Sequence, residues 1–147
     1  MSASTIGLAP DDYQALAEFR YQIRRFLQFS EHAARESGVE PRQHQALLAI
    51  RGMKPEKQPT IGEIATRLFL RHHSAVELVN RLEQGGLVVR ERHSEDGRQV
   101  LVRLTPAGER VLRRLSITHR EELQVTGPEL ARALQRLTRR NRKSEAA

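Results

Sequence analysis

The stretch TIGEIATRLFLRHHSAVELVNRLEQGGLVVRERHSEDGRQVLVRL, residues 60–104, decides the fold of this chain. Its first part predicts a short helix, because Thr60 stands three residues before Glu63. At this capping-box spacing each side chain satisfies a free backbone N–H of the other residue. Apolar residues then recur on one face of a 3.6-residue period, at Ile61, Ile64, Ala65 and Leu68.

A second helix is predicted from about Ser74, after a polar turn at residues 71–73. It ends at Gly85-Gly86, since glycine adopts the left-handed conformation of a C-terminal cap at no steric cost. At 100° per residue the helix has an apolar side, which we expect to face the core: Ala75, Leu78, Val79 and Leu82. The opposite side carries His73, Val76, Glu77 and Asn80.

A hairpin is predicted next, with strands at residues 87–93 and 98–104 around Asp96-Gly97. Asp-Gly favours the positive φ angles of a tight hairpin turn. In the second strand, alternation predicts one buried and one exposed face, with Val100, Val102 and Leu104 on the first and Gln99, Leu101 and Arg103 on the second. Two helices and an arginine-bearing hairpin predict a winged helix-turn-helix. Its second helix would enter the major groove, and its wing would contact the backbone or the minor groove.

Five segments resemble motifs of the MarR (multiple antibiotic resistance regulator) transcription factors. They are IATRL (64–68), SAVELVNRLE (74–83), GLV (86–88), DGR (96–98) and LVRLTPAG (101–108). The wing and the Leu-Thr-x-x-Gly segment are the more specific parts, since many regulator families share the helix-turn-helix pattern. The resemblance covers about residues 11–142. It implies a mainly α fold with a small β-hairpin wing, a winged helix-turn-helix with long N- and C-terminal dimerisation helices.

Helical patterns flank the winged helix-turn-helix on both sides. One predicted helix spans residues 10–37, and another follows Glu40-Pro41, because proline suits the first helical turn. After the wing, Thr105-Pro106 begins a helix that we expect Gly127-Pro128 to break, with another helix following. The sequence predicts a disordered N-terminus at residues 1–9 and a frayed tail at residues 143–147. Residues 10–37 and 105–142 together form the predicted dimerisation lobe, and residues 40–104 form the predicted DNA-binding lobe.

The apolar faces of the flanking helices need a partner. The resemblance implies that this partner is a second copy of the chain, which forms a homodimer. A two-fold dimer in turn predicts a pseudo-palindromic operator in double-stranded DNA, with half-sites about one helical turn apart. The alternative is a monomer whose terminal helices pack on each other.

The predicted DNA contacts on the second helix are His73, Ser74, Val76, Glu77, Asn80 and Arg81. Ser74 or His73 can donate to a phosphate or a base edge, and Val76 can contact a thymine methyl group. Glu77 departs from the basic or polar residue that family members often carry there. Near phosphates, the Glu77 carboxylate would have to pair with an arginine or accept a hydrogen bond from the amino group of a cytosine. We favour a second account, in which Ser74 is the N-cap and Glu77 its capping-box partner.

The predicted wing contacts are Arg90, Arg92, Asp96 and Arg98. By resemblance, Arg98 matches the family's arginine beside the hairpin turn and Asp96 the acid that braces it. An arginine there can enter the narrow minor groove or bind a phosphate. Arg90, Arg92 and His93 would add positive charge near the DNA backbone; the alternative for each is a solvated strand face.

Aromatic residues are concentrated in the first predicted helix, at Tyr13, Phe19, Tyr21, Phe26 and Phe29. They either pack this helix against others or line a pocket for a small aromatic effector, as the resemblance suggests. The candidate pocket residues are Tyr21, Phe26, His44 and Leu48. For His44 the alternative is a partly buried structural histidine.

Composition narrows the function classes. The 147 residues fit one domain or one protomer of a small oligomer, and the formal net charge of +7 favours an acidic partner such as nucleic acid. The absence of cysteine excludes disulfides and thiol-based redox sensing. No run approaches 18 apolar residues and no secretory signal is present, so we expect a cytoplasmic protein that contacts no membrane.

No residue pattern indicates catalysis, and we expect neither metal nor cofactor. The six histidines have no ligand spacing, and we find no nucleophile–base pair, phosphate-binding glycine loop or paired carboxylates. The prediction is a homodimeric, sequence-specific DNA-binding repressor that a small aromatic or phenolic effector releases. The alternatives are a ligand-independent architectural DNA binder and a winged-helix module that binds protein.

Overall fold

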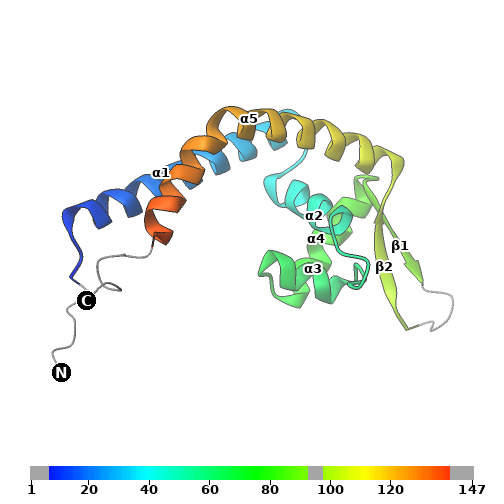
Figure 1. Cartoon of the computed structure of the whole chain (residues 1–147). Coiled ribbons are helices and arrows are strands. Elements are labelled where there is room, and N and C mark those ends of the chain that lie inside the picture. The colour runs from blue at the N-terminus through cyan, green and yellow to red at the C-terminus, as the bar shows by residue number, and fades with distance from the viewer. Residues whose placement is uncertain (1–6, 93–97, 140–147) are drawn as a thin grey trace, which may run out of the picture. The chain divides into compact units, whose positions relative to one another are not determined.

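The computed structural model describes residues 7–92 and 98–139 (Figure 1). Expectations for residues 1–6, for the hairpin turn at 93–97 and for the tail at 140–147 lie outside this range. Within it the elements follow in the order α1 (Pro10–Glu36), α2 (Pro41–Arg51), α3 (Ile61–Leu68), α4 (His72–Gln84), β1 (Val88–Arg92), β2 (Val100–Leu104) and α5 (Pro106–Thr138). The predicted fold class, mainly helical with a small antiparallel hairpin, is confirmed.

The chain divides into two compact units. One comprises Glu31–Thr118 and holds the helix-turn-helix and the hairpin; the other comprises Met1–Ser30 and His119–Ala147. The long helices α1 and α5 each contribute residues to both units.

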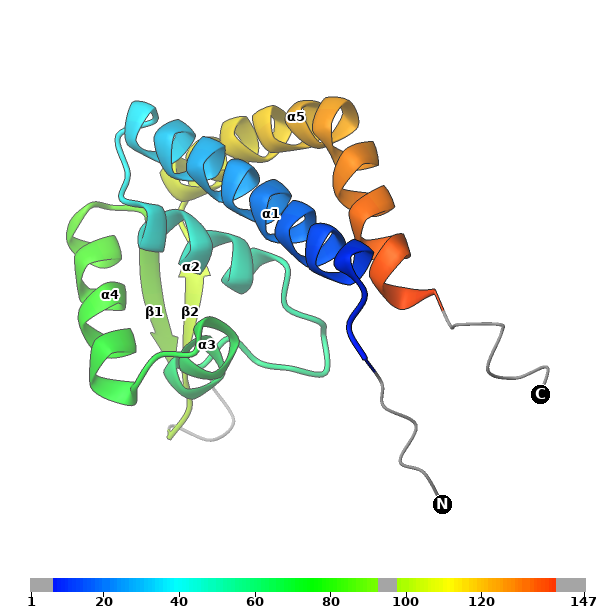
Figure 2. The same cartoon turned by 90° about the vertical axis from the view of Figure 1, so that its left-hand side faces the viewer.

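In the first unit, helices α2, α3 and α4 gather against the hairpin, with α4 alongside β1 (Figure 2). Strands β1 and β2 are antiparallel, with Val88 opposite Leu104 and Arg92 opposite Val100. One half of the capping box predicted for α3 is present, since the backbone N–H of Glu63 donates to Thr60 Oγ1 at 3.2 Å. The other half is replaced, because the N–H of Thr60 donates to the carbonyl of Gln58 at 2.8 Å. The core consists of Ala46, Leu47, Ile50, Ile64, Leu78, Val79, Leu82, Val88, Val102 and Leu112.

Strand β2 departs from the predicted alternation at Leu101. Alternation would expose Leu101 because its neighbour Val102 is fully buried, yet Leu101 is only 2 % exposed. Both faces of the strand are therefore covered at this point, where a half-buried strand was expected. The outer edge of β2 is also occupied, because the N–H of Val102 donates to the carbonyl of Pro59 at 2.9 Å. The segment before α3 thus satisfies a donor that an edge strand would leave to solvent.

The Leu-Thr-x-x-Gly segment joins the start of α5 to the residues just before β1. Thr105 donates its N–H to the carbonyl of Leu87 at 3.0 Å and its hydroxyl to the carbonyl of Gly86 at 2.6 Å. The same hydroxyl accepts from the N–H of Gly108 at 3.1 Å, as an N-cap does. Gly108 is buried so close to the Leu87 carbonyl oxygen that a Cβ atom there would overlap it. This motif therefore fixes where α5 begins.

The expected break at Gly127-Pro128 is wrong, because α5 continues through Pro128 to Thr138. Proline removes one helical hydrogen bond and clashes with the carbonyl four residues before it, which bends a helix without having to end it. The preceding Gly127 has no Cβ to clash with the proline ring, so it tolerates helical geometry better than other residues. The orange part of α5 bends accordingly in Figure 2.

In the second unit a buried polar contact joins α1 to the part of α5 after Pro128. Gln22, which is buried, donates to Glu18 at 3.0 Å and to Glu129 at 3.1 Å. Arg25 also contacts Glu129, at 3.3 Å. These contacts hold the last turns of α5 beside α1.

The rings of Phe26 and Phe29 meet His119 edge-on, at centroid distances of 5.9 and 5.5 Å. The histidine also shares a hydrogen bond with Ser30 Oγ at 2.7 Å. These two phenylalanines therefore serve packing within the unit. Tyr13 and Tyr21, by contrast, are more than half exposed.

Candidate nucleic-acid interface

Helix α4 has the two faces that its sequence predicts. Its apolar face is buried and consists of Ala75, Leu78, Val79 and Leu82. On the opposite face His73, Glu77 and Asn80 are exposed and Val76 is half-buried. The residues proposed to read DNA are therefore available to a partner of this unit.

The helix begins earlier than expected, and the capping account of Ser74 and Glu77 is wrong. Arg71 is the N-cap and provides no side-chain hydrogen bond, so Ser74 is the third residue inside the helix. The chain turns within three residues because Phe69 adopts the left-handed conformation, with φ 54°. Glu77 consequently has no capping role.

Glu77 instead lines a cavity of about 660 Å³ together with Ser74 and Arg81 of α4. The other walls come from the end of α1 and the start of α2, and they carry Arg35 and Arg42. Glu31 and Glu40 line the same cavity, so its walls carry acidic and basic side chains together.

Arg90 of β1 connects the wing to α4. Its guanidinium donates to Glu83 Oε1 at 2.9 Å and to Asn80 Oδ1 at 2.6 Å, while its backbone N–H donates to Glu83 Oε2 at 3.2 Å. We call Asn80, Glu83 and Arg90 the wing clamp. Two predicted DNA contacts, Asn80 and Arg90, thus bind each other, and the Asn80 amide presents its donor end away from Arg90.

On the wing itself, Arg92 and Arg98 are exposed and form no ion pair with any other described residue. Arg103 of β2 is paired with Glu91 of β1 at 2.8 Å. Asp96 and His93 lie outside the described residues. Two of the predicted wing arginines therefore keep their charge available for phosphates.

Comparison with known proteins agrees with this geometry. Residues 37–99 match the MarR family. The chain is 30% identical over 109 residues to YkoM of Bacillus subtilis, an HTH-type transcriptional regulator, and this alignment covers 72% of the chain and 69% of YkoM. The chain belongs to the MarR family.

Solved MarR structures share its fold. AbsC of Streptomyces coelicolor superposes with a TM-score of 0.69 at 18% identity, over 86% of this chain and 84% of AbsC. MepR of Staphylococcus aureus, solved in complex with DNA, gives a TM-score of 0.59 at 20% identity, over 73% of this chain and 76% of MepR. The chain is a MarR-family transcriptional regulator with a DNA-binding fold.

The four residues proposed for an effector pocket are divided between the two units. Tyr21 and Phe26 belong to one, and His44 and Leu48 to the other. His44 is buried, whereas Leu48 is 50% exposed and Tyr21 57% exposed. None of them lines the cavities reported in this section.

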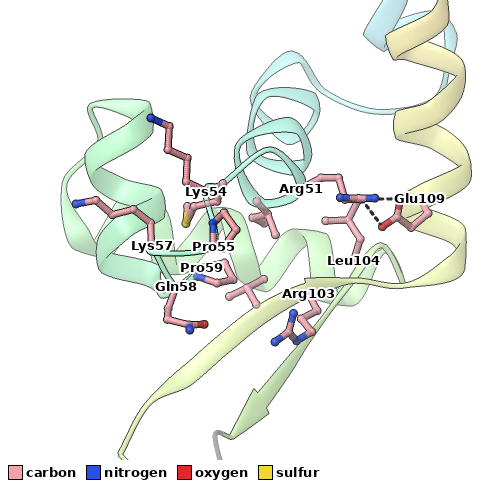
Figure 3. Close-up of a pocket in the computed structure, with 12 residues that line it drawn as sticks. Arg51, Lys54, Pro55, Lys57, Gln58, Pro59, Arg103, Leu104 and Glu109 are labelled. Carbon is pink, nitrogen blue, oxygen red and sulfur yellow. Dashed lines mark hydrogen bonds and ion pairs between the residues drawn. The ribbon is translucent and has the colours of Figure 1, made fainter.

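A smaller cavity of about 370 Å³ lies under the loop between α2 and α3, against β2 and the start of α5 (Figure 3). Arg51 on its wall is paired with Glu109 at 3.1 Å. Lys54 and Lys57 line it from the loop, and their side chains extend away from that ion pair. Lys57 also pairs with Glu63 at 3.9 Å, and its side chain is 64% exposed.

Across residues 7–92 and 98–139, no group of three or more His, Asp or Glu side chains is arranged to hold a metal ion. In the same ranges no helix has the length and apolar character to cross a membrane.

Proposed function

We propose that this MarR protein is a homodimeric repressor that places α4 of each protomer in the major groove of a pseudo-palindromic operator. The observation that carries the proposal is the exposed polar face of α4, which the wing clamp ties to the arginine-bearing hairpin. A rigid helix and wing can contact a groove and the adjacent backbone together. The formal charge of +7 favours the same partner.

The proposed dimer rests on apolar side chains that one chain leaves exposed. In the second unit these include Tyr13, Leu16, Tyr21, Leu27, Leu123, Val125 and Leu134. Monomeric proteins rarely expose so many large apolar residues along neighbouring helices. A second copy would bury them and bring two copies of α4 to one operator.

The proposed effector is a small aromatic or phenolic molecule that lowers operator affinity. Support comes from the family resemblance and from Leu48 of α2, an apolar side chain that is 50% exposed. A ligand releases a repressor when it binds the DNA-incompetent arrangement more tightly than the competent one. Titration of aromatic acids and phenols against the operator complex tests this part; unchanged affinity throughout would refute it and leave DNA binding intact.

The first experiment is selection of binding sites from a randomised duplex pool, followed by salt titration on the enriched site and on a scrambled control. We expect a palindromic site whose log affinity falls with log salt by about 0.9 per phosphate contact. Equal affinity for the scrambled duplex would indicate an architectural DNA binder. Absence of binding at low salt would indicate a protein-interaction module.

A further inference from the structure

Phe69, in the turn between α3 and α4, has a backbone conformation that its residue type disfavours. Among the described residues it alone combines a side chain with a positive φ, of 54°. The turn has the hydrogen bonds of a Schellman motif, from Leu70 N–H to the carbonyl of Ala65 at 2.9 Å and from Phe69 N–H to that of Thr66 at 3.3 Å. Glycine usually occupies the left-handed position of this motif.

Phe69 gains no packing in return for this conformation. Its side chain is 96% exposed, the most exposed of the large apolar residues described. The next residue, Leu70, turns the other way and packs against the core. The turn therefore directs an aromatic ring into solvent at the point where α4 begins, and strained residues of this kind are concentrated at functional sites.

The surroundings of Phe69 indicate a polyanionic partner. Arg67, Arg71 and His72 are all exposed, and within the described ranges none of them forms an ion pair. Positive charge beside an exposed aromatic ring is typical of a surface that contacts nucleic acid. A protein partner with an apolar pocket would not require these cations.

We propose that Phe69 contacts the 5-methyl group of a thymine at the edge of each operator half-site. This inference rests on the proposed function, in which the N-terminus of α4 enters the major groove. Phe69 precedes the first residue of α4 by three positions, so its Cα lies within about 10 Å of that residue. The major groove is about 12 Å wide and presents the thymine methyl group, which phenylalanine can contact.

The test is Phe69→Gly, which should have opposite effects on folding and on DNA binding. Glycine removes the left-handed strain, so the melting temperature should stay the same or rise. Loss of one apolar contact should weaken affinity about fivefold per half-site, or about 25-fold for both half-sites. Phe69→Leu should keep most of the affinity, and Leu8→Ala, at another exposed apolar residue, should keep all of it.

The thymine is identified by replacing each operator thymine in turn with deoxyuridine, which lacks only the methyl group. The inference requires a symmetric pair of positions at which the wild-type protein loses affinity and Phe69→Gly loses nothing further. The inference would be overturned if deoxyuridine lowered the affinity of both proteins equally, or if Phe69→Gly bound the unmodified operator with full affinity. In either case, operator binding by the wild-type protein would still support the proposed function. Absence of any preferred site for the wild-type protein would refute both.

Discussion

At the residue scale, the orientation of Asn80 limits what this side chain can recognise. An asparagine that reads adenine uses both ends of its amide, accepting through the oxygen and donating through the nitrogen. Here the oxygen already accepts from Arg90 at 2.6 Å. Asn80 is therefore best suited to donate to an acceptor such as guanine O6 or N7, or to a phosphate.

Asn80→Asp should separate the structural from the DNA-binding role of this position. The carboxylate can keep the bond to Arg90, so the unfolding free energy should change by less than about 1 kcal/mol. It has no donor and adds negative charge, so operator affinity should fall at least about tenfold. Chemical denaturation and fluorescence anisotropy measure the two quantities.

Gln84→Glu is the matched control for Asn80→Asp, since it places the same charge one turn further along α4. It should reduce affinity less. An equal reduction by both variants would mean that Asn80 contributes only through charge and contacts no DNA group itself.

The residue-level predictions from sequence succeeded where a local rule acts alone. The Thr60 cap and the buried face of α4 follow from spacing within one helix. The start of α4 was misplaced because the left-handed Phe69 shortens the preceding turn, and phenylalanine gives no sequence signal for that conformation. The wing clamp joins residues on two elements, and helical periodicity on α4 says nothing of a partner on β1.

At the element scale, the Thr105-x-x-Gly108 motif determines the register of α5 against the wing. Gly108→Ala should destabilise the protein by about 2–3 kcal/mol, because the added methyl group must displace the backbone of Leu87. Gly62→Ala, in α3, has ordinary van der Waals space for its methyl group and should change stability by less than about 1 kcal/mol. Thermal denaturation of both variants makes the comparison, and similar stabilities would show that α5 can shift to accommodate the methyl group.

A second boundary that the sequence misplaced is the expected break within α5. Gly127-Pro128 is a common signal for the end of a helix. Here, after the bend, the helix is held beside α1 by the contacts of Glu129 with Gln22 and Arg25. These partners lie more than 100 positions away in the sequence, so no local pattern could reveal them.

At the scale of the whole molecule, the dimer proposal can be tested on the exposed face of α5. Val125 is 77% exposed, and Val125→Asp would force a charge into an apolar interface. We expect the dimer dissociation constant, measured by sedimentation equilibrium, to rise at least about tenfold. Operator affinity should fall in parallel, because two half-sites must be bound together. Gln124→Asp, at an exposed polar neighbour, should have little effect. An unchanged dimer would place the interface elsewhere.

The two compact units share α1 and α5, and this sharing limits how the protein can be subdivided. The boundaries fall at residues 30–31 and 118–119, in the interior of those two helices, and not in a linker. A fragment of residues 31–118 would begin and end in mid-helix and would lose the helical hydrogen bonds across both cuts. The helix-turn-helix unit of this protein is therefore not a transferable module, and a fusion that uses it would have to include both long helices whole.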